Sequence, residues 1–81
     1  MKVQIRVITH VAHQHQVAEA LHRGGYPIAE RSYYPPLKGV CYLVEHPDLP
    51  FELDQEGLKS SVLRWLKLKL GYELFFVVMG A

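Results

Sequence analysis

The two halves of the chain repeat one order of hydrophobic patterns, and this repeat constrains the fold more than any other feature. In each half, a strand pattern and a helical pattern lead to a glycine–tyrosine pair, Gly25-Tyr26 and Gly71-Tyr72, and a second strand pattern follows. Glycine often follows a helix, because it adopts the left-handed conformation that ends many helices. The repeat predicts two strand–helix–strand units, which we expect to form a single domain over residues 1–81.

Four segments have strand patterns: residues 2–8, 26–34, 40–45 and 73–79. The first alternates apolar and polar side chains, which indicates a strand with one buried face. The third is apolar on both faces, so we expect it in the middle of a sheet. Pro27 has no N–H to donate, so the second strand is expected at an edge. The last strand is nearly all apolar and is expected at the other edge.

The first helix is expected to run from about His10 to His22 or Arg23, with Thr9 as its N-cap. Four side chains at helical spacing form its predicted core stripe: His13, Val17, Ala20 and Leu21.

The second helix is expected to begin after Asp54, its N-cap, and to end near Leu70, before Gly71. Leu53 and Leu58 stand at the two positions of a hydrophobic staple. Residues 66–70 alternate strictly and could by themselves form a strand. We interpret them as helical, because the pattern continues from Leu58 without a residue that breaks helices.

The order strand, helix, strand, strand, helix, strand predicts an α+β fold. It is typical of a ferredoxin-like βαββαβ sandwich, with a four-stranded antiparallel sheet and two helices on one face. Right-handed crossovers place both helices on the same side. The other face of the sheet is then without a cover in a monomer.

This open face is the expected association surface, because monomers rarely leave large apolar patches in water. The candidate interface residues are Arg6, Tyr33, Tyr34, Tyr42, Phe75, Phe76 and Val78. Of these, Tyr33 and Tyr34 belong to an exposed corner of tyrosines and prolines between the second and third strands. The sequence leaves open which side of the third strand faces outward, either Cys41 and Leu43 or Val40, Tyr42 and Val44. The last strand offers Leu74, Phe76 and Val78, or Phe75, Val77 and Met79. We expect a homodimer or a protein partner here.

Histidine is concentrated in the first half of the chain, at His10, His13, His15 and His22. Histidine is the commonest metal ligand, so a metal sensor is one hypothesis. The spacing matches no known ligand set and favours a solvated helix face, and we assign neither a metal nor a cofactor. Cys41 lies among apolar residues and is interpreted as a small core side chain. No phosphate loop, catalytic carboxylate pair or serine elbow is present, so the chain is not expected to be an enzyme.

The formal net charge is +1, and the first strand has no aromatic side chain on which a base could stack. Both observations count against a nucleic-acid partner. A single cysteine excludes an internal disulfide. No apolar run reaches membrane-spanning length and no apolar signal core is present, which indicates a cytoplasmic protein without a membrane partner.

The segment from Thr9 to Ile28 resembles the first loop and helix of ACT-type regulatory domains. Ala20-Leu21, Gly25 and Ile28 fall where that family has its alanine–leucine pattern, its glycine and its second strand, and the similarity extends over residues 2–28. The resemblance implies a loop that binds a small ligand, made of Thr9, His10, Val11, Ala12 and His13. Ala12 stands where the family has a glycine. A carboxylate at the start of a helix would be favoured by the helix dipole and free N–H groups.

Three functions follow as hypotheses. The first is a non-catalytic, dimeric regulatory module that senses a small anion or amino acid near the start of the first helix. The second is a protein-interaction module that docks through the open face of the sheet or the last strand. The third is a metal sensor that uses His10 and His13.

Overall fold

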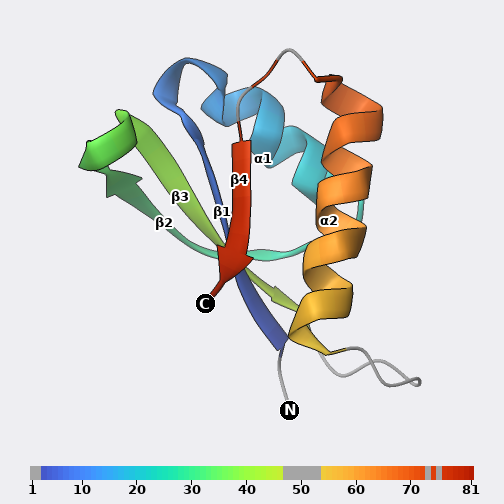
Figure 1. Ribbon diagram of the computed structural model, residues 1–81. Coiled ribbons are helices and arrows are strands. Elements are labelled where there is room, and N and C mark those ends of the chain that lie inside the picture. Colours follow the sequence, from blue (N-terminus) through green and yellow to red (C-terminus); the bar gives the residue numbers. More distant parts are fainter. Residues whose placement is uncertain (1–2, 47–53, 73, 75) are drawn as a thin grey trace.

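The computed structural model describes residues 3–46, 54–72, 74 and 76–81. It has an α+β architecture with a four-stranded antiparallel sheet and two α-helices (Figure 1). The elements, with two short 3-10 helices named η1 and η2, are β1 (Val3–His10), η1 (Val11–His13), α1 (Gln14–Arg23), β2 (Ile28–Tyr34), η2 (Pro35–Leu37), β3 (Gly39–His46), α2 (Gln55–Leu70) and β4 (Phe76–Gly80).

The strands are ordered β2-β3-β1-β4, and every neighbouring pair is antiparallel. The prediction that the third strand is central is confirmed, and so are the predictions that the second and last strands are edges. In the register, Val7 of β1 lies opposite Tyr42 of β3 on one side and Val78 of β4 on the other. Side chains directly opposite each other lie on the same face of a sheet, so these three share one face.

Both helices pack against that face. The buried core joins strand residues Ile5, Val7, Val40, Tyr42 and Val44 to helix residues Val17, Ala20, Leu21, Leu58, Val62 and Leu66. Cys41 and Leu43 therefore point to the opposite side, which decides between the two alternatives for β3. In the part of the chain that the structure describes, no helix lies on that opposite side, which we name the uncovered face.

The start of α1 differs from the prediction. Thr9 is not a helix N-cap, because β1 continues through it and pairs it with Val40 and Phe76. His10 caps η1 instead, and α1 begins only at Gln14. The strand is longer than predicted because both of its neighbours continue beside it. Val17, Ala20 and Leu21 are buried as predicted, whereas His13 is only partly buried.

The two helices lie next to each other (Figure 1). Trp65 of α2 donates from its Nε1 to the carbonyl of Ala20 in α1, at 2.6 Å. A Cβ on Gly24 would lie 2.5 Å from the same ring nitrogen. The indole thus fits against the C-terminal end of α1, where only a glycine leaves room for it.

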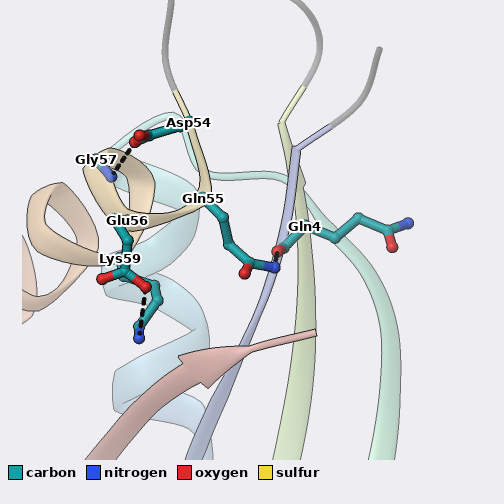
Figure 2. Close-up of polar contacts among 6 residues, drawn as sticks. All are labelled: Gln4, Asp54, Gln55, Glu56, Gly57 and Lys59. Carbon is teal, nitrogen blue, oxygen red and sulfur yellow. Dashed lines mark hydrogen bonds and ion pairs between the residues drawn. The ribbon is translucent and has the colours of Figure 1, made fainter.

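The N-terminus of α2 is capped and attached to the sheet (Figure 2). Asp54 accepts a hydrogen bond from the backbone N–H of Gly57 at 2.7 Å, as predicted. Gln55 donates from Nε2 to the carbonyl of Gln4 in β1 at 2.9 Å, and Glu56 pairs with Lys59 at 3.4 Å. Of the two residues of the predicted hydrophobic staple, Leu58 is buried and Leu53 lies outside the described residues.

Asp54→Ala is expected to lower the free energy of unfolding by about 1 kcal/mol, because one orphan N–H at the helix start loses its acceptor. Asp54→Ser is the matched control and should cost much less, since its hydroxyl also caps. Urea unfolding of the three proteins measures both effects. An equal loss in both variants would contradict a capping role for this side chain.

The C-terminus of α2 and the last strand also follow the sequence pattern in outline. Residues 66–70 are helical, and the helix ends at Gly71, which has φ +76°. The strand predicted over 73–79 is shorter in the structure: β4 comprises Phe76–Gly80, and Leu74 lies outside it. Residues 73 and 75 lie outside the described part of the chain. Among the described residues, no helix has both the length and the apolar character needed to cross a membrane.

Candidate functional site

The turn between β1 and α1 contains the five residues predicted to bind a ligand. The structure places them in three environments. Thr9 is fully buried in the sheet, His10 and His13 are partly buried, and Val11 and Ala12 are exposed. A ligand approaching from solvent would therefore meet the two histidines and the exposed backbone between them, and not the Thr9 side chain.

Three backbone N–H groups at this turn, those of Val11, Ala12 and Gln14, already have acceptors. Val11 donates to the carbonyl of Lys38 at 3.1 Å, which ties the turn to the β2–β3 connection. Ala12 donates to Nδ1 of His10 at 3.0 Å, and Gln14 donates to the carbonyl of Val11. An anion at this position would have to replace internal hydrogen bonds, so the turn is a weaker anion site than its place before a helix predicts.

His10 and His13 lie side by side, with ring centroids 6.2 Å apart. Nδ1 of His13 lies 3.2 Å from Oε1 of Gln16, and Nδ1 of His10 is occupied by the Ala12 N–H. No group of three or more potential metal ligands is found among residues 3–46, 54–72, 74 and 76–81. The described residues thus offer a pair of imidazoles here, fewer ligands than a structural zinc site requires.

His10→Ala is expected to destabilise the domain by about 1 kcal/mol, because the N–H of Ala12 loses its acceptor. His10→Asn is the matched variant, since the asparagine oxygen can accept from the same N–H and asparagine is a favoured cap residue. Thermal unfolding should show a drop in Tm of roughly 4–8 °C for the alanine variant alone. A similar drop for both variants would show that the imidazole has another structural role.

The second candidate surface is the uncovered face, to which all four strands contribute alternate side chains. These are Gln4, Arg6, Ile8 and His10 of β1, Glu30, Ser32 and Tyr34 of β2, Cys41, Leu43 and Glu45 of β3, and Val77 and Met79 of β4. Leu43, Val77 and Tyr34 are partly exposed, and Met79 is 41% exposed. The middle of the face thus combines these apolar side chains with Arg6, and its ends are polar.

Several residues predicted for this face lie elsewhere. Tyr42, Phe76 and Val78 point toward the helices. Tyr42 and Val78 lie directly opposite Val7 in the register, and Phe76 is two residues from Val78 and so points to the same side. Tyr42 is only 4% exposed, and its hydroxyl donates to the carbonyl of Gln14 at 2.9 Å. Of the two alternatives for each strand, the ones that put Tyr42, Phe76 and Val78 on the open face are therefore wrong. Strands that are apolar on both sides give no indication of which side is buried.

Of the remaining predicted interface residues, Arg6 and Tyr34 lie on the uncovered face. Tyr33 is opposite Val40 and so lies on the helix side of the edge strand β2, where it is 70% exposed. Phe75 lies outside the described residues. Met79 belonged to one of the two alternatives for the last strand, and it lies on the uncovered face because it is directly opposite Arg6 in the register.

Arg6 occupies the centre of the uncovered face. It lies opposite Leu43 on one side and Met79 on the other, and its Nη1 approaches Sγ of Cys41 at 3.8 Å. Cys41 and Ile8, beside it, are 4% and 2% exposed. The guanidinium group therefore lies over apolar side chains, with its charge on the surface.

The acidic groups of this face lie away from its centre. Glu45 accepts a hydrogen bond from Nε2 of Gln4 at 2.7 Å, near one end of the central strands. Glu30 lies opposite Leu43, on the edge strand β2. The face thus has one cation in the middle and two carboxylates toward its margin.

No protein-family model matches the sequence, and a search of the curated proteins finds no relative. The evidence for a function at the turn near His10 and at the uncovered face therefore comes from their geometry.

The two edges of the sheet differ in their protection against pairing with another strand. β2 carries Glu30 and Arg31, and its register shifts between Ile28 and Glu30. The guanidinium carbon of Arg31 lies 5.0 Å from the centre of the Tyr33 ring, and Nη2 of Arg31 donates to Oε1 of Gln14. A side-chain hydrogen bond between Arg31 and Tyr33 raises the pKa of Arg31. Charges and irregularities of this kind discourage strand addition. The described residues of β4 carry no charge, so β4 is the less protected edge.

Proposed function

We propose that this chain is a small association domain of the ferredoxin-like class, which pairs with a second copy of itself through the uncovered face of its sheet. The fold assignment is supported by the order of elements, βαββαβ, and by the central position of the first and third strands. The observation that carries the function is the group of partly exposed apolar side chains around Arg6 on the uncovered face, Leu43, Val77 and Met79. A sheet with helices on one face only leaves its other face available for a partner.

The distribution of charge favours a second copy as the partner. In a twofold-symmetric pair, the same surface of both protomers forms the interface, and one copy is rotated by 180° relative to the other. With the twofold axis between Arg6 and the marginal carboxylates, Arg6 of one protomer would lie near Glu30 or Glu45 of the other, and the apolar side chains would meet around the axis. Complementary charges of this kind fix the orientation of an interface.

Met79→Glu tests this proposal. The new carboxylate lies opposite Arg6 in the same chain, so the monomer should remain folded, since opposite charges across strands are tolerated. In a dimer the same carboxylate would be buried between apolar surfaces without water, which weakens association strongly. Sedimentation velocity from about 10 to 500 μM should show a wild-type dimer and a monomeric variant, with a Kd raised at least 100-fold.

Leu68→Glu is the matched control, because Leu68 is 74% exposed on α2, and α2 packs against the opposite face of the sheet. It should leave the dimer intact. A wild-type protein that stays monomeric at 500 μM, or a Met79→Glu variant that dimerises as well as the control, would refute association through this face.

Ligand sensing at the η1 turn is the second candidate function. It is supported by the adjacent imidazoles of His10 and His13, which lie in a turn whose residues Val11 and Ala12 are exposed. The resemblance of residues 2–28 to ACT-type domains belongs to this proposal, in which a cytoplasmic dimer binds a small anion or amino acid. The satisfied N–H groups of the turn make it the weaker of the two.

A thermal-shift screen against amino acids, small anions, nucleotides and divalent metals tests this second candidate. A ligand at 100 times its Kd should stabilise the native state by about 2.7 kcal/mol, a rise in Tm of roughly 10 °C or more for a domain of this size. A true ligand of the turn should lose its effect in a His10→Asn, His13→Asn double variant. No shift with any compound would remove the support for sensing.

A further inference from the structure

The outer side of α2 carries a second apolar stripe that the core does not use. Leu58, Val62 and Leu66 are fully buried against the sheet. Leu68 is 74% exposed, and Tyr72, just beyond the helix, is 86% exposed. The apolar side chains of this helix therefore serve two surfaces, and only one of them is covered in the part of the chain that the structure describes.

A hollow of about 550 Å³ lies on this side of α2. Its lining consists of Ser60, Leu63, Arg64, Lys67, Leu68 and Tyr72. The spacing of three and four residues from Ser60 to Leu68 places these five side chains along one side of α2, and Tyr72 follows just after the end of the helix. In Figure 1, α2 lies beside β4 and α1. The hollow is open to solvent, and its volume falls within the range of about 300–1,000 Å³ that is common for pockets that bind small organic ligands.

Among the described residues that line this hollow, the charged side chains, Arg64 and Lys67, are both cations. Arg64 and Lys67 are exposed, and the ion pairs seen among the described residues, Arg23 with Glu19 and Lys59 with Glu56, do not involve them. Nζ of Lys67 lies 5.6 Å from the centre of the Tyr72 ring. Such an exposed cation–π contact is weak, about 0.5–1 kcal/mol, so the ammonium group can turn toward an anion.

We propose that this hollow binds a small amphipathic anion, an alkyl or aryl group that carries a carboxylate or phosphate. The apolar part would lie on Leu63 and Leu68, and the anion would lie between Arg64 and Lys67, with the hydroxyl of Ser60 as a further donor. A second copy of the chain does not fit the same surface, because two identical basic stripes would repel each other. This site is separate from the uncovered face and does not depend on it.

The probe is octanoate, which has eight carbons and one carboxylate. Titration into the ¹⁵N-labelled protein should shift the amide signals between Ser60 and Tyr72, saturably, with a Kd on the order of 1 mM. Octylammonium has the same chain and the opposite charge, and acetate has the charge without the chain. Both should bind at least tenfold more weakly. Equal binding of octylammonium, or octanoate shifts centred on another surface, would overturn the proposal.

Two variants examine the contacts directly. Arg64→Gln combined with Lys67→Gln should weaken octanoate binding at least tenfold, and so should Leu68→Ser. All three residues are exposed, so the fold should be unaffected. Leu37→Ser and Lys38→Gln make the same kinds of change in the distant η2 turn and should leave binding unchanged. Full octanoate affinity in the double variant would contradict a role for the two cations.

The anion could be a free metabolite or a lipid headgroup, and vesicles distinguish these sources. Sedimentation with phosphatidylglycerol vesicles, which are anionic, is compared with phosphatidylcholine vesicles. Octanoate binding without sedimentation supports a free ligand. Octanoate binding together with selective sedimentation on the anionic vesicles supports a lipid source. Sedimentation on anionic vesicles without any octanoate binding would overturn the hollow as a ligand site.

Discussion

Leu66→Ala is expected to lower the free energy of unfolding by about 3 kcal/mol. Leu66 is fully buried between α2 and the sheet and belongs to the same cluster as Val7 and Val62. Its truncation removes apolar contacts and leaves a cavity that the packed neighbours fill only in part. For a domain of this size, Tm should fall by more than about 12 °C. Urea unfolding at 15 °C and calorimetry measure the two quantities.

Leu68→Ala is the matched control, because it is the same substitution two residues along the same helix. Leu68 is 74% exposed, so its replacement should change stability by less than about 0.5 kcal/mol. The pair also separates the two interpretations of residues 66–70. On a strand, positions 66 and 68 would share one face and respond alike. Similar losses in the two variants would contradict a helix here.

Gly39→Ala is expected to destabilise the domain by about 2–3 kcal/mol. A Cβ at Gly39 would lie 2.6 Å from the carbonyl oxygen of Thr9. That oxygen belongs to the backbone of the central strand β1, which cannot move without disturbing β3 and β4 on either side of it. The same shift would strain the hydrogen bond from Val11 to Lys38 that holds the η1 turn. Chemical denaturation gives the loss, and amide hydrogen exchange at Val11 reports on the turn.

Gly25→Ala is the comparison for this glycine. Gly25 has φ +77°, and a Cβ there would meet no atom within 4 Å. Its cost should come from the left-handed backbone alone, about 1 kcal/mol. Gly39→Ala should therefore be clearly the more damaging of the two. If Gly25→Ala cost as much, the close approach of β3 to β1 would not be the reason for glycine at position 39.

Elements that depend on local patterns were predictable from the sequence. The cap at Asp54, the end of α2 at Gly71 and the buried stripe of α1 each follow from residues within one or two turns. The start of α1 was not predictable in this way. Thr9 has the properties of an N-cap, yet it is buried in a strand because Val40 and Phe76, distant in the sequence, pair with it.

The candidate surfaces show the same division. The sequence indicated an open sheet face with Arg6 on it, because apolar and polar side chains alternate clearly in the first strand. It did not indicate that Tyr42 and Val78 lie under the helices. A strand with apolar residues on both sides shows no alternation that would tell which side is buried. The second apolar stripe of α2 was also not recognised. A leucine such as Leu68 is equally suited to a core, and only the structure shows that Leu66 is buried there while Leu68 is exposed.

The sequence by itself determined the order of strands and helices, the points where both helices end and the α+β class, because these depend on side-chain periodicity and on glycine at helix ends. Only the tertiary structure decided which face of β3 and β4 is buried, that position 39 has no room for a side chain, and that Trp65 joins the two helices through Ala20. These features depend on backbone and side-chain atoms far apart in the chain. Their positions exist only after the sheet and the helices have packed together.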